Sequence, residues 1–166
     1  MTYQPPGFFD TAILEEKSVK TTIAAAQSAS YTRAVLNGSE IEYEPHDDAT
    51  HVLYRCSFQW INEPDANTHM YLALMDKTLA GDPWAYVTDR QWSASALKNI
   101  EYCSYETIEI LLPTWSGSKF LSIYVRTSTS ATECKLNQLK LDGTSYDTGS
   151  EGYVDVSVSC TSMRNS

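Results

Sequence analysis

The sequence predicts an all-β protein, an antiparallel β-sandwich or jelly roll of about eight or nine strands that follow an extended N-terminal arm. Two observations predict this class: segments in which apolar and polar residues alternate recur along the chain, and turn-forming residues separate them. Little helical periodicity lies between these segments. The length of 166 residues fits a single domain over residues 11–166, preceded by an arm of residues 1–10.

The first ten residues are expected to form the arm, because Pro5 and Pro6 favour an extended, polyproline-like backbone. Tyr3, Phe8 and Phe9 place three aromatic side chains on a segment too irregular to bury them in a core of its own. Exposed apolar groups of this kind mark contact surfaces. We therefore expect the arm to pack either on its own domain or on a neighbouring subunit.

The clearest strand covers residues 51–60, where one face carries Val52, Tyr54, Cys56, Phe58 and Trp60 at every second position. Alternation, β-branched residues and aromatic residues predict the other strands. Their ranges are 12–25, 31–36, 39–43, 70–75, 85–92, 101–112, 120–125, 133–141 and 154–160.

Two irregularities are expected within these strands. Asn37-Gly38 separates two strand segments and predicts either a type I′ hairpin turn or a bulge in one long strand. The alternation of residues 133–141 slips near Asn137-Gln138, as a β-bulge would cause.

The charge restricts the partners that the protein can take. Twelve basic and 21 acidic residues give a net charge of −9 and a pI near 4.7. Such a chain repels phosphate backbones and anionic membranes, so we expect neither nucleic acid nor membrane as a partner. No apolar run approaches the roughly 18 residues of a membrane span. Residues 1–10 lack a basic region typical of secretory leaders, which predicts synthesis in a cytoplasm.

The four cysteines, Cys56, Cys103, Cys134 and Cys160, form no C-x-x-C pair. Each lies in an apolar or alternating segment, so we expect small buried hydrophobic side chains within strands. The even number leaves disulfides as the alternative for a protein outside the cell.

Motifs of catalysis are missing from the sequence. It contains no nucleophile elbow, P-loop, dinucleotide-binding fingerprint or H-E-x-x-H. His46 and His51 flank an acidic run, residues 44–48, that lacks the ligand spacing of a calcium loop. Glu106 and Glu109 would point to opposite faces of a strand, so they cannot act as an acid–base pair. We expect a non-enzymatic protein without metal or cofactor.

Aromatic residues in predicted turns provide a second set of candidate contact residues. Trp84 follows Gly81-Asp82-Pro83, and Trp115 lies between two turn signals. With Tyr86 or Tyr124, they could form a platform on which sugar rings or another subunit stack. The alternative for the two tryptophans is packing against the rim of their own domain.

The pattern of residues 12–60 resembles the opening of jelly-roll domains found in bacteriophage virion proteins, particularly those of marine and cyanobacterial phages. The resemblance lies in a Thr-rich strand, the small polar stretch Gln27-Ser-Ala-Ser-Tyr31, a strand with a polar break over 34–45 and the alternating strand 51–60. Residues 132–143 are similar to a late strand of such domains, whereas 144–166 extend beyond the pattern.

Related domains occur in tail fibres, head fibres and capsid-decorating proteins, so the resemblance implies a non-enzymatic virion structural protein made in the host cytoplasm. Among these roles we expect a capsid decoration or cement protein on the particle surface. Such domains often form trimers, so the implied partners are two further copies and the major capsid protein or other virion subunits. The alternative is a carbohydrate- or receptor-binding module of a tail or head fibre that binds a cell-surface glycan.

Overall fold

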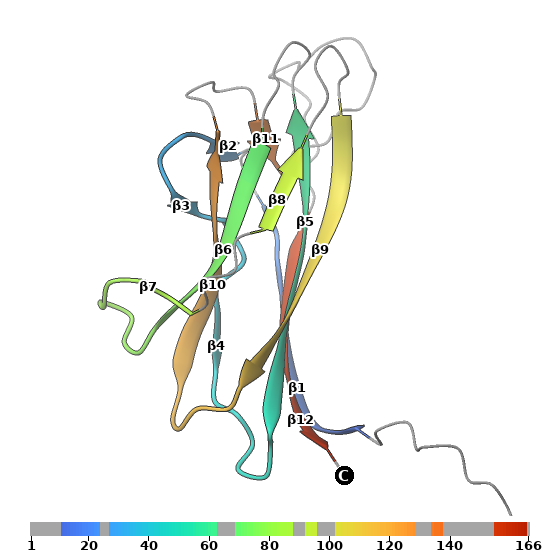
Figure 1. The fold of residues 1–166 in the computed structure, drawn as a ribbon, viewed down its shortest axis with the longest axis vertical. Coiled ribbons are helices and arrows are strands. Elements are labelled where there is room, and N and C mark those ends of the chain that lie inside the picture. The colour runs from blue at the N-terminus through green and yellow to red at the C-terminus, as the bar shows by residue number, and fades with distance from the viewer. Residues whose placement is uncertain are drawn as a thin grey trace, which may run out of the picture.

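The protein consists of two antiparallel β-sheets packed face to face. The computed structural model describes residues 11–23, 27–62, 69–87, 92–95, 102–128, 134–137 and 155–165. Figure 1 shows the long strands of both sheets running along the long axis of the molecule. The start of β1 (Thr11–Thr21) and the end of β12 (Val156–Asn165) lie together at one end, where Thr11 pairs with Asn165. The predicted arm, with Tyr3, Phe8 and Phe9, lies outside the described residues.

The sheets differ in the strands that they contain. The first sheet consists of β1, β12, β2 (Gln27–Ala29), β5 (His51–Asn62), β9 (Tyr102–Pro113) and β11 (Cys134–Leu136). The second sheet consists of β3 (Ala34–Val35), β4 (Ile41–Tyr43), β6 (His69–Lys77), β7 (Ala85–Tyr86), β8 (Trp92–Ser95) and β10 (Lys119–Thr127).

The strand order identifies a jelly roll. β12 and β11 pair with successive halves of β5 on one side, and β9 pairs with its other side. In the second sheet, β4 and β3 share one side of β10, while β7 and β8 share the far side of β6. The twelve described strands therefore fill eight positions, ordered 1-8-3-6 and 2-7-4-5 along the chain, which is the double Greek key of a jelly roll.

This arrangement confirms the predicted all-β sandwich and jelly roll, and it explains why twelve strands are described rather than eight or nine. Four of the eight positions are each occupied by two strands in place of one, namely β1 with β2, β3 with β4, β7 with β8, and β11 with β12. The predicted strand 85–92 is divided into β7 and β8, which pair with different parts of β6. Of the predicted strand 133–141, the structure describes β11 and Asn137, whose left-handed φ of 59° interrupts the extended backbone after Leu136; residues 138–141 lie outside the described residues.

The core lies between the sheets and follows the predicted alternation. Val52, Tyr54, Cys56, Phe58 and Trp60 of β5 are all buried, each 0% or 1% exposed. They pack against inward side chains of the facing sheet, namely Leu72, Leu74, Leu121, Ile123 and Val125. The sequence prediction of this face is confirmed.

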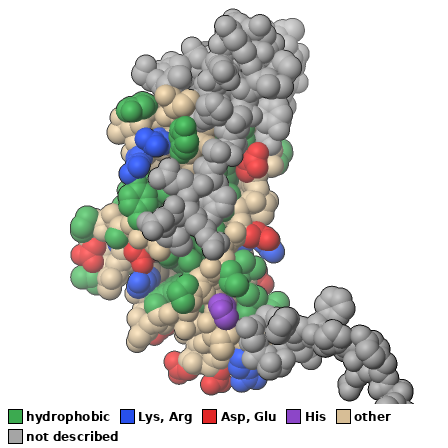
Figure 2. Space-filling view, in the orientation of Figure 1, with side chains coloured by type: hydrophobic (Ala, Val, Ile, Leu, Met, Phe, Trp, Pro, Cys, Tyr) green, Lys and Arg blue, Asp and Glu red, His purple; other side chains and the backbone are tan. Residues whose placement is uncertain are grey.

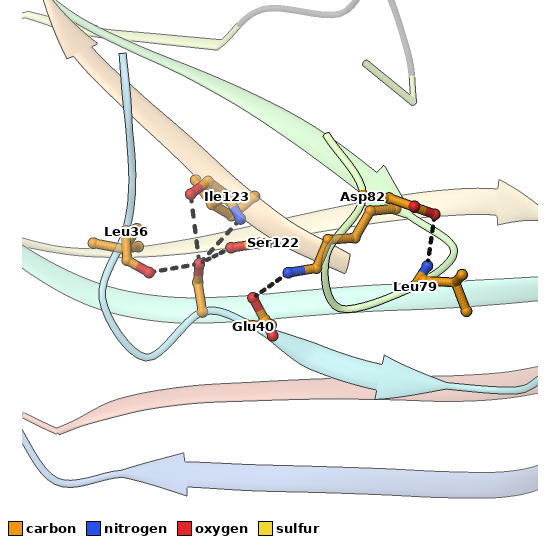
Figure 3. Close-up of polar contacts among 8 residues, drawn as sticks. Leu36, Glu40, Leu79, Asp82, Ser122 and Ile123 are labelled. Atoms are coloured by element: carbon orange, nitrogen blue, oxygen red, sulfur yellow. Dashed lines mark hydrogen bonds and ion pairs between the residues drawn. The ribbon is translucent and has the colours of Figure 1, made fainter. Parts of the chain in front are cut away.

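The Asn37-Gly38 irregularity is a break in one long strand position, not a hairpin turn. β3 and β4 lie on the same side of β10, and the Ser39 side chain fills the gap between them. The Ser39 hydroxyl accepts from the Ile123 amide at 3.0 Å and lies 2.8 Å from both the Leu36 carbonyl and the Ser122 hydroxyl (Figure 3). A side chain thus replaces the missing backbone partner of β10.

Gly38 is the residue that makes this break possible. Its φ is +85°, and a Cβ atom at this position would lie 3.0 Å from the Cβ atoms of Thr21 and Val156 in the first sheet. The turn therefore touches the facing sheet closely, and only glycine fits without strain.

We predict that Gly38→Ala lowers the free energy of unfolding by about 1–3 kcal/mol, since it combines a left-handed φ with steric overlap. Gly81→Ala is the matched control: no atom lies within 4 Å of its added Cβ. Urea unfolding of both variants measures the difference. Equal stability of the two variants would contradict the requirement for glycine at position 38.

Candidate functional site

One outer surface carries an alternating set of basic and aromatic side chains, which we call the cation–aromatic face. It lies on the outside of the second sheet, where residues of β6 and β10 that face away from the core meet β7 and the segment before β3. Figure 2 shows basic side chains among hydrophobic ones on the side where β10 lies. The face consists of Arg33, Tyr71, Lys77, Trp84, Tyr86, Phe120, Tyr124 and Arg126.

Lys77 connects the rings at one end of this face. Its ammonium group lies 4.3 Å from the Trp84 ring centroid and 5.1 Å from that of Phe120. Trp84 in turn meets Tyr124 edge to face at a centroid distance of 6.0 Å. Burial beneath these neighbours raises the pKa of the Tyr124 phenol. These contacts hold the Trp84 ring in a fixed position on the outer surface.

Two arginines occupy the other end of the face. The Arg33 guanidinium lies 4.9 Å from the Tyr86 ring centroid, and the Arg126 guanidinium lies 4.8 Å from that of Tyr71. Both arginines line a small crevice whose other walls include Tyr71, Tyr86 and Tyr124. The crevice has a volume of about 10 Å³, which is roughly enough for one water molecule.

The structure brings together three of the four residues that were predicted to form a contact platform and places the fourth elsewhere. Trp84, Tyr86 and Tyr124 belong to the cation–aromatic face. Trp115 instead packs against the core and meets Tyr43 edge to face at 6.4 Å. Its indole nitrogen is buried and has no hydrogen-bond partner among the described residues. Trp84 thus contacts residues on the outer surface of the second sheet, whereas Trp115 contacts the core between the sheets.

Trp115 also lines a cleft at the open edge of the sandwich, between β9 and the β6–β7 pair. The cleft has a volume of about 500 Å³. Its floor includes the core residues Ile110, Leu112 and Leu121, and its rim includes the Lys119–Asp76 ion pair, with 2.8 Å between nitrogen and oxygen. The cleft thus opens toward the core and has a mixed polar and apolar lining.

The acidic and histidine residues do not converge on a common site in the described part of the chain. Glu106 accepts from the indole nitrogen of buried Trp60 at 3.2 Å, while Glu109 pairs with Arg55 on the outer face. The predicted opposite orientation of the two glutamates is thus confirmed. Among the described residues, no three His, Cys, Asp or Glu side chains are grouped closely enough to hold a metal ion.

A second surface feature lies on the outside of the first sheet. Cross-strand register places Ile13, Met163, His51 and Pro113 in one row, and Thr161, Leu53 and Leu111 in the next. Ile13 is 67% exposed and Leu111 is 56% exposed. We call this set the apolar strip: Ile13, Leu53, Leu111, Pro113 and Met163. The neighbouring rows are polar and include the Arg55–Glu109 ion pair and the Ser57–Thr107 hydrogen bond.

Both surfaces contain residues that the sequence pattern alone does not indicate as site residues. Arg33, Tyr71 and Arg126 were not identified as site residues, because only the register of β3, β10 and β6 brings them together. Ile13 and Leu111 were likewise not identified, although each is an apolar residue at a position expected to face outward. Their alternation with core residues is the signal that could have found them.

Comparison with known proteins identifies a distant structural similarity. No family model and no curated protein matches the sequence. The chain is similar to the structure of Eiger TNF from S. frugiperda, with a TM-score of 0.37 and 9% identity over 81% of this chain and 91% of that chain. At this level of similarity, the jelly-roll assignment rests on the strand order. No described helix has the length and apolar character required to cross a membrane.

The two cysteines whose side chains are described, Cys56 and Cys160, are free thiols in the core and 0% exposed. This confirms the predicted state for both. Burial raises the pKa of each thiol to about 12, from an ordinary value of 9.0. Both thiols are therefore protonated at neutral pH and are unsuited to act as nucleophiles.

We predict that the free energy of unfolding is insensitive to thiol ionisation below about pH 8 and falls between pH 9 and about 12. In that interval the unfolded thiols lose protons that the folded thiols retain, so rising pH favours unfolding. Urea unfolding across this range measures the effect. The variant Cys56→Ala/Cys160→Ala should show a shallower decline, and an identical decline would contradict the prediction.

Proposed function

We propose that the protein is a non-enzymatic structural component of a virion surface, a capsid decoration or cement protein that assembles as a homotrimer on other virion subunits. The resemblance of residues 12–60 to virion jelly-roll domains supports this setting. The observation that carries the assembly step is the apolar strip, a group of apolar side chains at one end of the first sheet's outer face, of which Ile13 and Leu111 are more than half exposed.

The occupant that we propose for the apolar strip is the N-terminal arm of a neighbouring copy. The arm sequence supplies the aromatic residues Tyr3, Phe8 and Phe9, which match an apolar surface. Ten extended residues span up to about 35 Å, which is long enough to reach from one domain to the next. An aromatic anchor in an apolar surface is the usual energetic centre of a protein–protein contact.

Strand direction favours a neighbouring copy over the arm's own domain. From Ile13, the paired residues of β1 continue through Ala12 to Thr11, and this direction leads away from the row that contains Leu53 and Leu111. An arm that continued in the same direction would not contact the Leu53 and Leu111 row of its own domain. Exchange of such arms between copies gives a closed, symmetric assembly.

A second candidate function is glycan binding by a fibre module. The observation that favours it is the cation–aromatic face, where Trp84, Tyr86 and Tyr124 share one outer surface. Aromatic rings held on a surface offer flat apolar faces to the C–H groups of sugars. Trp115 takes no part in this candidate site, since it packs against the core.

We predict that the wild-type protein has a solution mass of about 56 kDa, three times the chain mass of 18.6 kDa, and that Leu111→Ser reduces it to that of one chain. Polar replacement removes an apolar contact without disturbing the core, because Leu111 is 56% exposed. Deletion of residues 1–10 should have the same effect. Multi-angle light scattering measures the mass.

Tyr105→Ser is the matched control, since Tyr105 is 65% exposed on the same strand and the same face but lies outside the apolar strip. It should leave the assembly intact. A wild-type protein that remains a single chain at all concentrations would contradict the proposal. So would an assembly that tolerates loss of both the arm and Leu111.

A further inference from the structure

We propose that the cation–aromatic face binds an acidic polysaccharide, with Arg33 and Arg126 as the residues that recognise its carboxylate or sulfate groups. This inference rests on the second candidate function, glycan binding, and adds the chemical class of the glycan. It does not depend on the assembly proposed for the first sheet, because the two surfaces lie on opposite sides of the sandwich.

The register places the two arginines side by side. Ala34 of β3 pairs with Val125 of β10, so the next positions along the two antiparallel strands bring Arg33 opposite Arg126. Both side chains line the same crevice. Like charges directly opposite each other on a sheet are destabilising, and an anion between them relieves the repulsion.

Neither arginine has an acidic partner among the described residues. Other basic side chains in this part of the protein do have one: Lys77 lies 3.4 Å from Glu40, and Lys119 lies 2.8 Å from Asp76. Arg33 and Arg126 are instead placed over tyrosine rings. A guanidinium that stacks on a ring keeps its N–H donors at its edge, where they can bind a carboxylate or sulfate in bidentate fashion.

The shape of the surface indicates a chain-like ligand. The crevice between the arginines holds only about 10 Å³, too little to enclose even one sugar ring. A ligand must therefore lie across the face rather than enter it. From the arginines, the surface continues over Tyr124 to Trp84, which would contact further sugar units through their C–H faces.

The charge balance favours a polymer with one carboxylate per sugar over duplex nucleic acid, which carries one negative charge per about 1.7 Å of its axis. The chain carries a net charge of −9, and long-range repulsion opposes the dense charge of a phosphate backbone. Two adjacent guanidinium groups can neutralise one or two anionic groups. A polysaccharide with one carboxylate per sugar matches that number, and its uncharged atoms match the aromatic remainder of the face.

The test compares a galacturonic acid decamer with the same decamer as its fully methylated ester, so that the backbone is equal and only the charge differs. Isothermal titration calorimetry at low salt measures affinity for the wild-type protein and for Arg33→Gln/Arg126→Gln. We expect the acid to bind at least about tenfold more tightly than the ester, and the double variant to lose that difference. Arg55→Gln, which removes one positive charge from the outer face of the first sheet, should bind like the wild type.

Each other outcome overturns the inference in a distinguishable way. Equal binding of acid and ester would refute the role of charge but keep glycan binding. Binding of neither decamer at millimolar concentration would refute both. A loss of affinity in Arg55→Gln equal to that in the double variant would show an effect of net charge only. Tighter binding of a single-stranded DNA decamer would assign the face to nucleic acid instead. Urea unfolding of each variant verifies its fold.

Discussion

Successive side chains of a β-strand point to opposite faces, and this constraint divides each long strand of the protein between the shared core and an outer surface. On β5, one face supplies buried aromatic and apolar residues, and the other supplies Leu53 and Arg55. On β10, Leu121 and Ile123 enter the core while Tyr124 and Arg126 face outward. The two outer surfaces are thus set by the same alternation that builds the core, yet they differ in chemistry.

Buried hydroxyl groups join the two sheets within this apolar interior. The Tyr54 hydroxyl donates to the Ser39 carbonyl at 2.9 Å, and the Tyr43 hydroxyl lies 2.7 Å from that of Ser162. Each bond links a residue of one sheet to a residue from the other sheet or its connecting segment. Burial raises the pKa of both phenols, so both hydroxyl groups remain protonated at neutral pH. Directional bonds of this kind fix how the sheets lie relative to each other.

The sequence predicted the features that depend on local pattern. The alternation of residues 51–60 identified the core face of β5, and the Asn37-Gly38 pair located an irregularity between β3 and β4 without deciding between a hairpin turn and an interruption of one long strand. Features that depend on the register between strands could not be predicted from the sequence. Nothing in the local pattern places Arg33 opposite Arg126 or Ile13 beside Met163. For Trp115 the sequence leaves a contact platform and packing against its own domain as alternatives, and its ring packs against the core and meets Tyr43 edge to face. Tertiary packing decided that orientation.

The proposed assembly depends on one contact, in which the aromatic arm of one copy lies on the apolar strip of another. The most direct measurement is photocrosslinking from benzoylphenylalanine placed at Phe8, in a mixture of ¹⁴N- and ¹⁵N-labelled chains that distinguishes contacts between copies from contacts within one. We expect crosslinks of mixed isotope composition to peptides that contain Leu53, Leu111 or Met163. Crosslinks confined to single chains, or directed to the second sheet, would contradict it.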